Sequence, residues 1–411
     1  MEQQEAGRDI HCKCFSSIDW SFYRQTRTME NAPLTNVQLQ KQTLFKSEEG
    51  CVYRIPALFY DTENETLLAF AERRETAADT STEKLVVAKG KVSCSERSIQ
   101  WTEPEEVKEA CKHHHRPMNP CPVYDKKNSK LFLFFICIEG KLSDWDQIDK
   151  GTNKTRLCYI TSEDHGDNWS EEVTDLTDKL DEVKDWATFA VGPGHGLQTE
   201  SGRLIVPVYG YPKNDRSHSL ALYSDDSGLS WQFGKMIQTN SVECEMAEFF
   251  DEGNKSIIYC NARCEGGNRV EAASGNDGGD FSQLSGAENL VETGGGCQGS
   301  VVSFPAQSEG ENAEGEQREN QNKWLLFTHP SDKSKRINLG VYLNKSPKSP
   351  SAWSKPWIIY HGPSGYSDLA YIGGGWFACL MECGEKKETE QIASVVFSYK
   401  DIEQRIRDSC P

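Results

Sequence analysis

Two stretches, SEDHGDNW (Ser162–Trp169) and SDDSGLSW (Ser224–Trp231), share the pattern Ser-x-Asp-x-Gly-x-x-Trp, and each follows an apolar run. A third stretch, SGNDGGDF (Ser274–Phe281), keeps the pattern with Asn276 in place of Asp and Phe281 in place of Trp. The aspartate can accept hydrogen bonds from the backbone of a tight turn, the glycine permits positive φ, and the aromatic ring fills the space beneath. The copies are roughly 50 to 60 residues apart, which is the scale of one propeller blade. They therefore predict a structural repeat and carry no catalytic chemistry.

The rest of the chain has the rhythm of an all-β protein. Short runs rich in Val, Ile, Leu, Phe and Tyr, such as KLFLFFICIEG (130–140) and GRLIVPVYGY (202–211), alternate with turns rich in Gly, Asn, Asp, Ser and Pro. This pattern predicts a sandwich, barrel or propeller, and the repeats favour the propeller. Only EVTDLTDKLDEVKDW (172–186) has helical spacing.

Two segments depart from this rhythm. Residues 1–40 are polar and irregular and are expected to form an N-terminal extension; lipidation of Cys12 and Cys14, which lie in it, remains open. The segment 305–323 is charged, rich in Gly, Asn, Gln and Glu, and lies between two predicted strands. It is expected to be a disordered insertion loop within a single β domain that spans 41–405.

Composition excludes several classes of partner. The 411 residues carry a net charge of −18, which argues against binding to nucleic acid and against a polybasic membrane footprint. The 15 cysteines are an odd number without a CxxC pair, as expected for reduced thiols. No secretory signal and no long apolar run are evident. We therefore expect a cytoplasmic or peripheral membrane protein with no obligate protein partner.

One charged residue lies where an apolar strand is predicted. Arg54 stands within VYRIPALFY (52–60), and burial of an unpaired guanidinium costs several kcal/mol. Either the side chain reaches the edge of the sheet, or an anionic ligand meets it. The histidines of KHHHR (His113–His115) cannot converge on one ion from consecutive positions, so neither a metal nor another cofactor is expected.

Several motifs together resemble the animal sialidase (neuraminidase) family. The resemblance extends from about residue 44 to 399, and the motifs that carry it, besides the repeats, are YRIPAL (53–58), LLAFAERR (67–74), MNPCPVY (118–124), TFAVGPGHG (188–196), GCQGSVVSF (296–304) and GYSDLA (365–370). It implies a six-bladed antiparallel β-propeller and a retaining exo-α-sialidase that releases terminal sialic acid from gangliosides, oligosaccharides or glycoproteins. Non-lysosomal members fit best, and among them the plasma-membrane, ganglioside-preferring type. The resemblance therefore favours a peripheral location at the plasma membrane or endosomes over the cytoplasm.

The resemblance also implies a set of catalytic residues. Three arginines of the family hold the carboxylate of sialic acid, because a guanidinium stays charged and meets carboxylates bidentately; the matching positions are Arg54, Arg263 and Arg336. Sialidases use a tyrosine nucleophile where other retaining glycosidases use a carboxylate, and Tyr366 matches it.

The same match assigns the proton transfers. Glu243 is expected to draw the proton of Tyr366 and lower its effective pKa, although Glu245 would share its strand face and could be mistaken for it. Asp79, on a loop rich in Thr, Ala and Ser, is expected to protonate the leaving oxygen and then activate water.

Further positions are expected to shape the substrate pocket. Arg74 and Glu72 lie on the predicted strand before Asp79, and Met118 and Asn119 could form the N-acyl subsite. Tyr209 and Tyr211 share one strand face and could pack against the glycerol arm or the acyl arm. The full set of expected binding residues beyond the three arginines is Arg74, Glu72, Met118, Asn119, Tyr209, Tyr211 and Gln298.

Other functions stay open at the level of sequence. A catalytically inactive propeller that only binds sialylated glycans is the main alternative. A glycosidase with a pair of carboxylates and a trans-sialylating enzyme are the others.

Overall fold

The computed structural model describes residues 39–307 and 322–408, and these residues belong to one compact unit. The expected N-terminal extension with Cys12 and Cys14, except for residues 39 and 40, lies outside the described residues. Most of the expected insertion loop, 305–323, also lies outside the described residues. It connects two strands, since β20 ends at Pro305 and β21 begins at Lys323.

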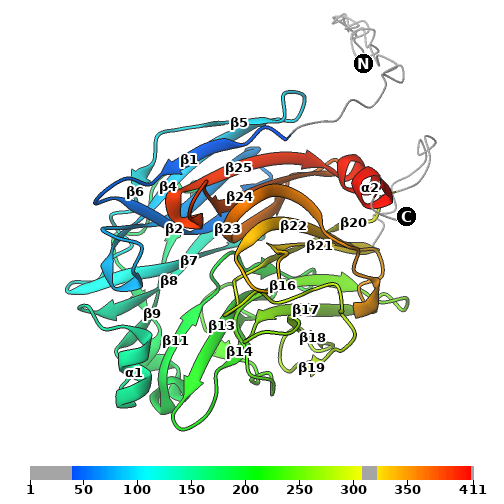
Figure 1. Ribbon diagram of the computed structural model, residues 1–411. Helices are drawn as coiled ribbons and strands as arrows, with labels where there is room; N and C mark the ends of the chain where they lie inside the picture. Colours follow the sequence, from blue (N-terminus) through cyan, green and yellow to red (C-terminus); the bar gives the residue numbers. More distant parts are fainter. Residues whose placement is uncertain (1–38, 308–321, 409–411) are drawn as a thin grey trace, which may run out of the picture. The chain divides into compact units, whose positions relative to one another are not determined.

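Within the described residues the strands form five hydrogen-bonded sheets, nearly all of them antiparallel meanders (Figure 1). The first contains β2 (Val52–Asp61), β3 (Thr66–Arg74), β4 (Thr82–Ser93), β5 (Ser98–Trp101) and β6 (Glu105–Glu106). The second contains β7 (His115–Asp125), β8 (Lys130–Glu139), β9 (Thr155–Ser162) and β10 (Thr174–Asp175). The third contains β11 (Trp186–Val191), β12 (Leu197–Gln198), β13 (Leu204–Pro212), β14 (His218–Ser224) and β15 (Gln232–Phe233). The fourth contains β16 (Val242–Phe250), β17 (Ser256–Arg263), β18 (Val270–Ser274) and β19 (Ser282–Gln283).

The fifth sheet has seven strands and joins two blades. It contains β20 (Ser300–Pro305), β21 (Lys323–Pro330), β22 (Ile337–Asn344), β23 (Trp357–Tyr371), β24 (Trp376–Cys383), β25 (Gln391–Ser398) and β1 (Gln42–Lys46). The first half of the long strand β23 pairs with β22, and its second half pairs with β24. Divided at that point, the sheets give the six groups of four main strands that the resemblance implies.

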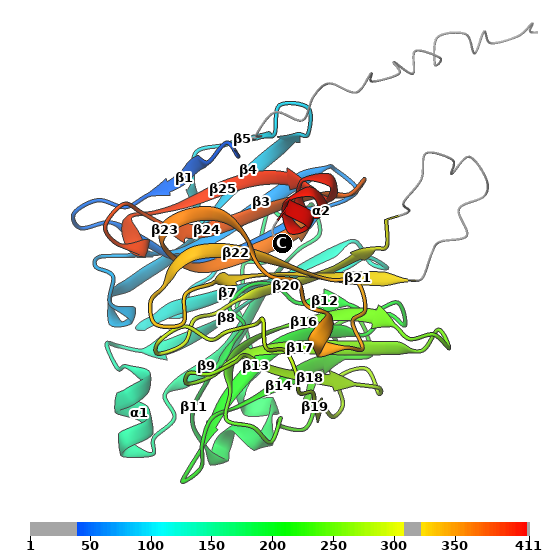
Figure 2. The ribbon, with the colours of Figure 1, turned by 45° about the vertical axis from the view of Figure 1, so that its right-hand side comes forward.

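The two ends of the described chain meet in the last blade. Strand β1 pairs antiparallel with β25, with Gln42 opposite Ser394, and blue β1 lies along red β25 in both ribbon views (Figures 1 and 2). An edge closed in this way leaves fewer unpaired backbone groups. The predicted all-β propeller is confirmed.

The hydrophobic core fills the spaces between successive sheets. One buried cluster joins side chains of β7 to β9 with those of β11 to β14, and another joins β16 and β17 with β20 to β22. Strands packed on both faces read as continuous apolar runs, which explains the composition of KLFLFFICIEG (130–140).

The repeats form the expected turns. Asp164 accepts hydrogen bonds from the backbone N–H and the side chain of Asn168, at 2.8 and 2.7 Å. Asp226 accepts from the N–H of Ser230 at 2.8 Å, and in the third copy Asn276 accepts from the N–H of Asp280 at 3.0 Å. The asparagine therefore preserves the turn although its charge is lost.

The aromatic residue of the second repeat also packs as predicted. The ring of Trp231 lies 4.8 Å from that of Phe134 and 5.8 Å from that of Phe132, both on the preceding sheet. This turn thus joins two blades.

We expect Gly228→Ala to destabilise the protein without changing substrate affinity. Gly228 has φ of +85°, and a Cβ built on it would lie 2.4 Å from Cζ of Phe132, so the substitution adds overpacking of about 1–3 kcal/mol to the strain of positive φ. The matched control is Gly202→Ala, which has φ of +95° but nothing within 4 Å of the new Cβ. Urea denaturation should show the larger loss for Gly228→Ala, and equal losses would contradict this packing argument.

The prediction of a helix over residues 172–186 is wrong. This segment contains β10 and two short 3₁₀ turns, Thr177–Lys179 and Asp181–Asp185. Leu176, Leu180 and Val183 are buried in the core between blades. Their helix-like spacing arises because successive tight turns, and not one α-helix, direct them into the core.

The α-helices of the described residues lie elsewhere. They are α1 (Asp144–Lys150), which a capping box of Ser143 and Asp146 begins and Gly151 in the left-handed conformation ends, and α2 (Tyr399–Asp408). No helix within residues 39–307 and 322–408 is both long and apolar enough to cross a bilayer. All cysteines of these residues are free thiols.

Candidate active site

Three arginines from different blades surround the side chain of Tyr366. Arg54 lies on β2, Arg263 ends β17, and Arg336 immediately precedes β22. The guanidinium carbons of Arg54 and Arg336 lie 5.6 and 5.4 Å from the centre of the Tyr366 ring, and Nη1 of Arg263 donates to its Oη at 3.1 Å. Four residues that lie far apart in the sequence, the three arginines and Tyr366, therefore meet at one site.

Each guanidinium has an acceptor that offsets the repulsion between these cations. Arg263 pairs with Glu243 at 2.9 Å, and Arg54 pairs with Glu382 at 2.6 Å. Arg336 donates to the carbonyl of Gly296 at 2.8 Å and has no carboxylate partner among the described residues. The set is thus only partly neutralised, which suits an anionic ligand.

Tyr366 donates a hydrogen bond from its buried hydroxyl to Oε1 of Glu243. Burial, and next to it the negative charge of Glu243, raise the pKa of Tyr366, while Arg263 and Arg336 act in the opposite direction. The expectation that Glu243 lowers this pKa is wrong, because a carboxylate disfavours a neighbouring phenolate. Glu243 can serve as a base only by taking the proton as the oxygen attacks.

The contacts of Glu243 also resolve its ambiguity with Glu245. The register of β16 shifts between Val242 and Cys244, and Glu243 contacts Tyr366 and Arg263. Glu245 lies deeper and hydrogen-bonds Ser300 instead.

Glu382 is a residue that the sequence reasoning missed. Its Oε1 accepts from Nε of Arg54 at 2.6 Å and from the N–H of Ile55 at 2.9 Å, while Oε2 accepts from the N–H of Tyr366 at 3.1 Å. Ile55 has φ of +60°, a strained conformation for a β-branched residue, and the β2–β3 register shifts there. Glu382 therefore holds the distorted strand, the arginine and the tyrosine together. A charged residue within the apolar run FACLMEC could have signalled it.

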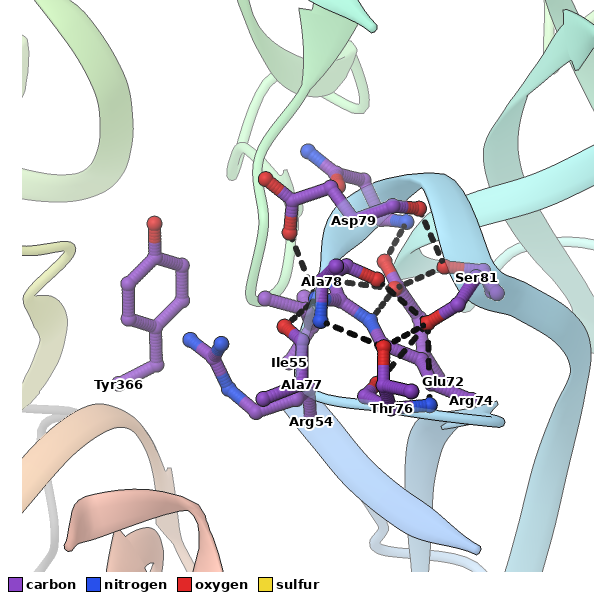
Figure 3. A network of polar contacts seen from close by, with 12 residues as sticks. Arg54, Ile55, Glu72, Arg74, Thr76, Ala77, Ala78, Asp79, Ser81 and Tyr366 are labelled. Atoms are coloured by element: carbon purple, nitrogen blue, oxygen red, sulfur yellow. Dashed lines mark hydrogen bonds and ion pairs between the residues drawn. The ribbon is translucent and has the colours of Figure 1, made fainter. Parts of the chain in front are cut away.

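The loop that carries Asp79 is anchored by a buried ion pair. Arg74 donates from Nε to Glu72 at 2.7 Å and from Nη1 to Oδ1 of Asp79 at 2.6 Å. The side chain of Asp79 is 71% exposed, whereas those of Glu72 and Arg74 are fully buried. In Figure 3 the Tyr366 ring lies to the left of the Arg54 guanidinium, and the Asp79 carboxylate lies above the guanidinium and to its right. An acid and a nucleophile could therefore reach a ligand held there from two directions.

The other expected pocket residues lie near this centre with varied contacts. Met118 and Asn119 are buried, and the side-chain amide of Asn119 donates a hydrogen bond to the carbonyl of Val191 at 3.0 Å. The rings of Tyr209 and Tyr211 lie 6.2 Å apart, and burial raises the pKa of Tyr211 to about 12.

Gln298 is engaged within the protein framework. It donates to Glu245 and to the carbonyl of Pro193 at 3.1 and 3.3 Å and accepts from the N–H of Ser367 at 3.1 Å. These contacts occupy both the amide nitrogen and the carbonyl oxygen of the Gln298 side chain. Gln298 is therefore better placed to support neighbouring residues than to contact a ligand.

Asp144, at the start of α1, is a second residue that sequence reasoning missed. Burial raises its pKa from 3.8 to about 6, with Asp79 adding to the increase and Arg116 opposing it. Its negative charge in turn raises the pKa of Tyr209 and Tyr211, after the effect of burial. Asp144 therefore shares the electrostatic environment of the tyrosines and Asp79.

The side chain of Arg116 connects the Asp79 loop to the segment that precedes α1. Its Nε donates to the carbonyl of Asp79 at 3.2 Å, and its two terminal nitrogens donate to the carbonyls of Gly140 and Leu142 at 2.5 and 2.6 Å. The Asp79 loop and the segment that leads into α1 are thus joined by one side chain.

We expect Asp144→Asn to stabilise the protein at neutral pH. Because the folded state raises the pKa of Asp144, this group favours folding below about pH 4, and that contribution is lost as the pH rises through about 6. The neutral amide avoids the loss, so the variant should exceed wild type by about 1–3 kcal/mol at pH 7 and by only about 0.5 kcal/mol at pH 4. Melting temperatures across this range measure the difference, and a constant offset would contradict the titration.

Comparisons with known proteins agree with this geometry. Residues 56–379 match the family model described as a BNR repeat-like domain. The chain is 41% identical to human Sialidase-3, covering 89% of this chain and 94% of that protein, and 43% identical to Sialidase-2 of Cricetulus griseus, covering 88% and 96%.

Solved sialidase structures share the fold. The Hadza microbial sialidase Hz136 superposes with a TM-score of 0.69 at 20% identity, covering 85% of this chain and 66% of that one. Trypanosoma rangeli sialidase in complex with sialic acid superposes with a TM-score of 0.67 at 18% identity, covering 90% and 60%. With relatives above 40% identity along nearly all of its length, this chain belongs to the sialidase family.

Proposed function

We propose that the protein is a retaining exo-α-sialidase that hydrolyses terminal sialic acid from glycoconjugates. The observation that carries this proposal is the convergence of Arg54, Arg263 and Arg336 on Tyr366, which is itself hydrogen-bonded to Glu243. Three guanidinium groups with only two carboxylate partners leave positive charge for the carboxylate of a sugar acid.

In the first step Tyr366 Oη attacks the anomeric carbon and its proton passes to Glu243. The glycosidic bond breaks as Asp79 donates a proton to the departing oxygen, which leaves a sialyl–tyrosine intermediate. A phenol attacks this carbon with less repulsion than a carboxylate would, because the carbon already bears a carboxylate.

In the second step Asp79, now ionised, accepts a proton from water as the water attacks the same carbon. The bond to Tyr366 breaks, and its oxygen recovers the proton from Glu243. Two inversions at one carbon give net retention.

The arrangement of Arg74, Glu72 and Asp79 supports the role of Asp79. A fully buried pair holds the loop, while the Asp79 carboxylate remains 71% exposed and can exchange protons with solvent. Met118, Asn119, Tyr209 and Tyr211 are proposed to line the pocket for the rest of the sugar, and no metal or other cofactor takes part in these steps.

The proposed substrates are gangliosides, oligosaccharides and glycoproteins, reached from the cytoplasm or from a peripheral membrane location. The similarity to Sialidase-3 supports this proposal. We also propose that 41–405 act as one catalytic propeller, with 1–40 and 305–323 as accessory segments.

The test is to incubate the purified full chain with an α-sialoside and follow the product by proton NMR from the first minute. A retaining enzyme releases the α-anomer of sialic acid first, before it mutarotates. Release of the β-anomer first would overturn the retaining mechanism. Absence of release, with binding retained, would favour the glycan-binding alternative.

A further inference from the structure

A second pair of acidic residues lies one step deeper than the proposed catalytic pair. Glu245 follows Glu243 by two residues on β16, and Asp368 follows Tyr366 by two residues on β23. Side chains two residues apart in a strand share a face. The side chains of Glu245 and Asp368 are both 0% exposed, so two carboxyl groups lie beneath the reacting pair.

The hydroxyl of Ser300 lies between these two groups. Its Oγ is 2.8 Å from Oε2 of Glu245 and 2.8 Å from Oδ1 of Asp368. It also accepts from the N–H of Leu369 at 3.0 Å. His195 Nδ1 lies 2.7 Å from the same Asp368 oxygen and 3.7 Å from Oε2 of Glu245.

Counting protons shows that one carboxyl group must be protonated. A hydroxyl carries a single hydrogen, so Ser300 can donate to only one of the two carboxyl oxygens, and the other must donate to Ser300. Both acids accept hydrogen bonds from neutral donors, Asp368 from the N–H of Leu58 at 2.6 Å and Glu245 from the amide of Gln298 at 3.1 Å. The imidazole distinguishes them, since Nδ1 of His195 lies 2.7 Å from Asp368 and 3.7 Å from Glu245, and Asp368 therefore suits the anionic form better. The proton then belongs to Glu245.

The surrounding charges agree with this assignment. Among the described residues, His195 is the one basic side chain within ion-pair distance of Glu245 or Asp368. Burial, followed by the charge of Asp368, raises the pKa of Glu245 well above its usual range.

The other titratable groups facing the pair are thiols. Burial first, and the two acids next, raise the pKa of Cys121 on β7 and of Cys379 on β24. These thiols therefore add no charge that could stabilise a second anion.

A metal ion is a poorer occupant than a proton. His195, Glu245 and Asp368 place potential ligand atoms within 4.8 Å of one another. The Ser300 hydroxyl bridges the two carboxyl groups, and the N–H of Val301 also donates to Glu245 at 2.9 Å. An ion would have to replace the shared proton and break the hydrogen bonds that these oxygens already make.

The pair is connected to the strand of the proposed nucleophile through Gln298. Oε1 of Glu245 accepts from the amide of Gln298 at 3.1 Å, and the Gln298 carbonyl oxygen accepts from the N–H of Ser367 at 3.1 Å. That N–H belongs to the peptide bond that directly follows Tyr366. We infer that Glu245 is a neutral carboxylic acid at physiological pH and that, through Gln298, it positions Tyr366 for the reaction. The positioning role rests on the proposed function; the protonation state does not.

The first experiment measures the proton directly. Infrared difference spectra at pH 7 of wild type against Glu245→Gln should show the carbonyl band of a buried carboxylic acid that the variant lacks. The matched control is Glu292→Gln, since Glu292 is also buried but pairs with Arg269 at 2.8 Å and its pKa is lowered. That control should keep the acid band, and absence of the band from wild type would overturn the inference.

The second experiment measures positioning. Glu245→Ala breaks the link to Gln298 and should lower kcat by about 10²-fold with little change in KM, the scale of a misplaced reacting group. Glu245→Gln keeps the neutral shape and loses only the Val301 contact, so kcat should stay within about tenfold of wild type. Equal losses in both variants would show that the charge of Glu245 matters and would overturn the inference. If wild type releases no sialic acid but keeps the acid band, the proposed function fails while the protonated Glu245 stands.

Discussion

Tyr366→Phe should lower kcat by at least about 10³-fold on a synthetic α-sialoside, the scale for loss of a nucleophile that acts together with its base. The hydroxyl is the atom that Glu243 and Arg263 both contact, and no other described hydroxyl occupies that position between the three arginines. Binding of the sugar carboxylate should persist, because Arg54, Arg263 and Arg336 are unchanged. Steady-state kinetics, together with the affinity for free sialic acid, measure both effects.

The substitution is suited to this test because it preserves packing. Tyr366 is buried with Ile55 and Cys297, and phenylalanine fills the same volume. Glu243 and Arg263 remain paired with each other at 2.9 Å, so no buried charge is left alone. The melting temperature should stay within a few degrees of wild type, about the shift that 1 kcal/mol produces. Turnover near that of wild type would exclude Tyr366 as nucleophile.

The fold was accessible from sequence because its signals are local. The Ser-x-Asp-x-Gly-x-x-Trp turns depend on residues four apart, such as Asp164 and Asn168, and the strands are marked by apolar runs. The helix predicted over 172–186 was wrong because that prediction also depended on a local signal. A spacing of apolar residues within one segment does not distinguish an α-helix from two successive 3₁₀ turns.

The site was only partly accessible, because its contacts are distant in sequence. Arg54 and Glu382 are 328 positions apart, and nothing near either residue encodes the other. The resemblance supplied Arg54, Tyr366 and Asp79, whose roles depend on the ligand. It did not supply Glu382 or Asp144, whose importance appears only when the blades close and bury their carboxyl groups.

The electrostatics required the three-dimensional structure. Sequence placed Glu243 and Glu245 on one face and could not separate them, whereas the depth of each side chain does. Glu243 contacts the phenol of Tyr366 and the guanidinium of Arg263, whereas Glu245 is connected to Asp368 through the hydroxyl of Ser300. Two glutamates of the same strand thus receive opposite proposed protonation states from their neighbours.

Glu382→Ala should be the most destabilising single substitution at the site, by about 3–5 kcal/mol, because it leaves Arg54 as a buried charge without its partner. The side chain of Arg54 is only 10% exposed and that of Glu382 is fully buried. The N–H groups of Ile55 and Tyr366 would also lose their acceptor, which adds a desolvation cost. Urea denaturation, read as a lower midpoint with an unchanged slope, measures this loss.

The matched control is Glu385→Ala, three residues further along the chain, whose side chain is exposed. It should change stability by no more than about 0.5 kcal/mol, as surface substitutions do. Activity separates two explanations for the effect of Glu382→Ala. If Glu382 also aligns Arg54 and Tyr366, kcat/KM should fall by at least about 10²-fold under conditions where the variant is fully folded. A folded variant with wild-type kcat/KM would show that Glu382 stabilises the strand without aligning Arg54 and Tyr366.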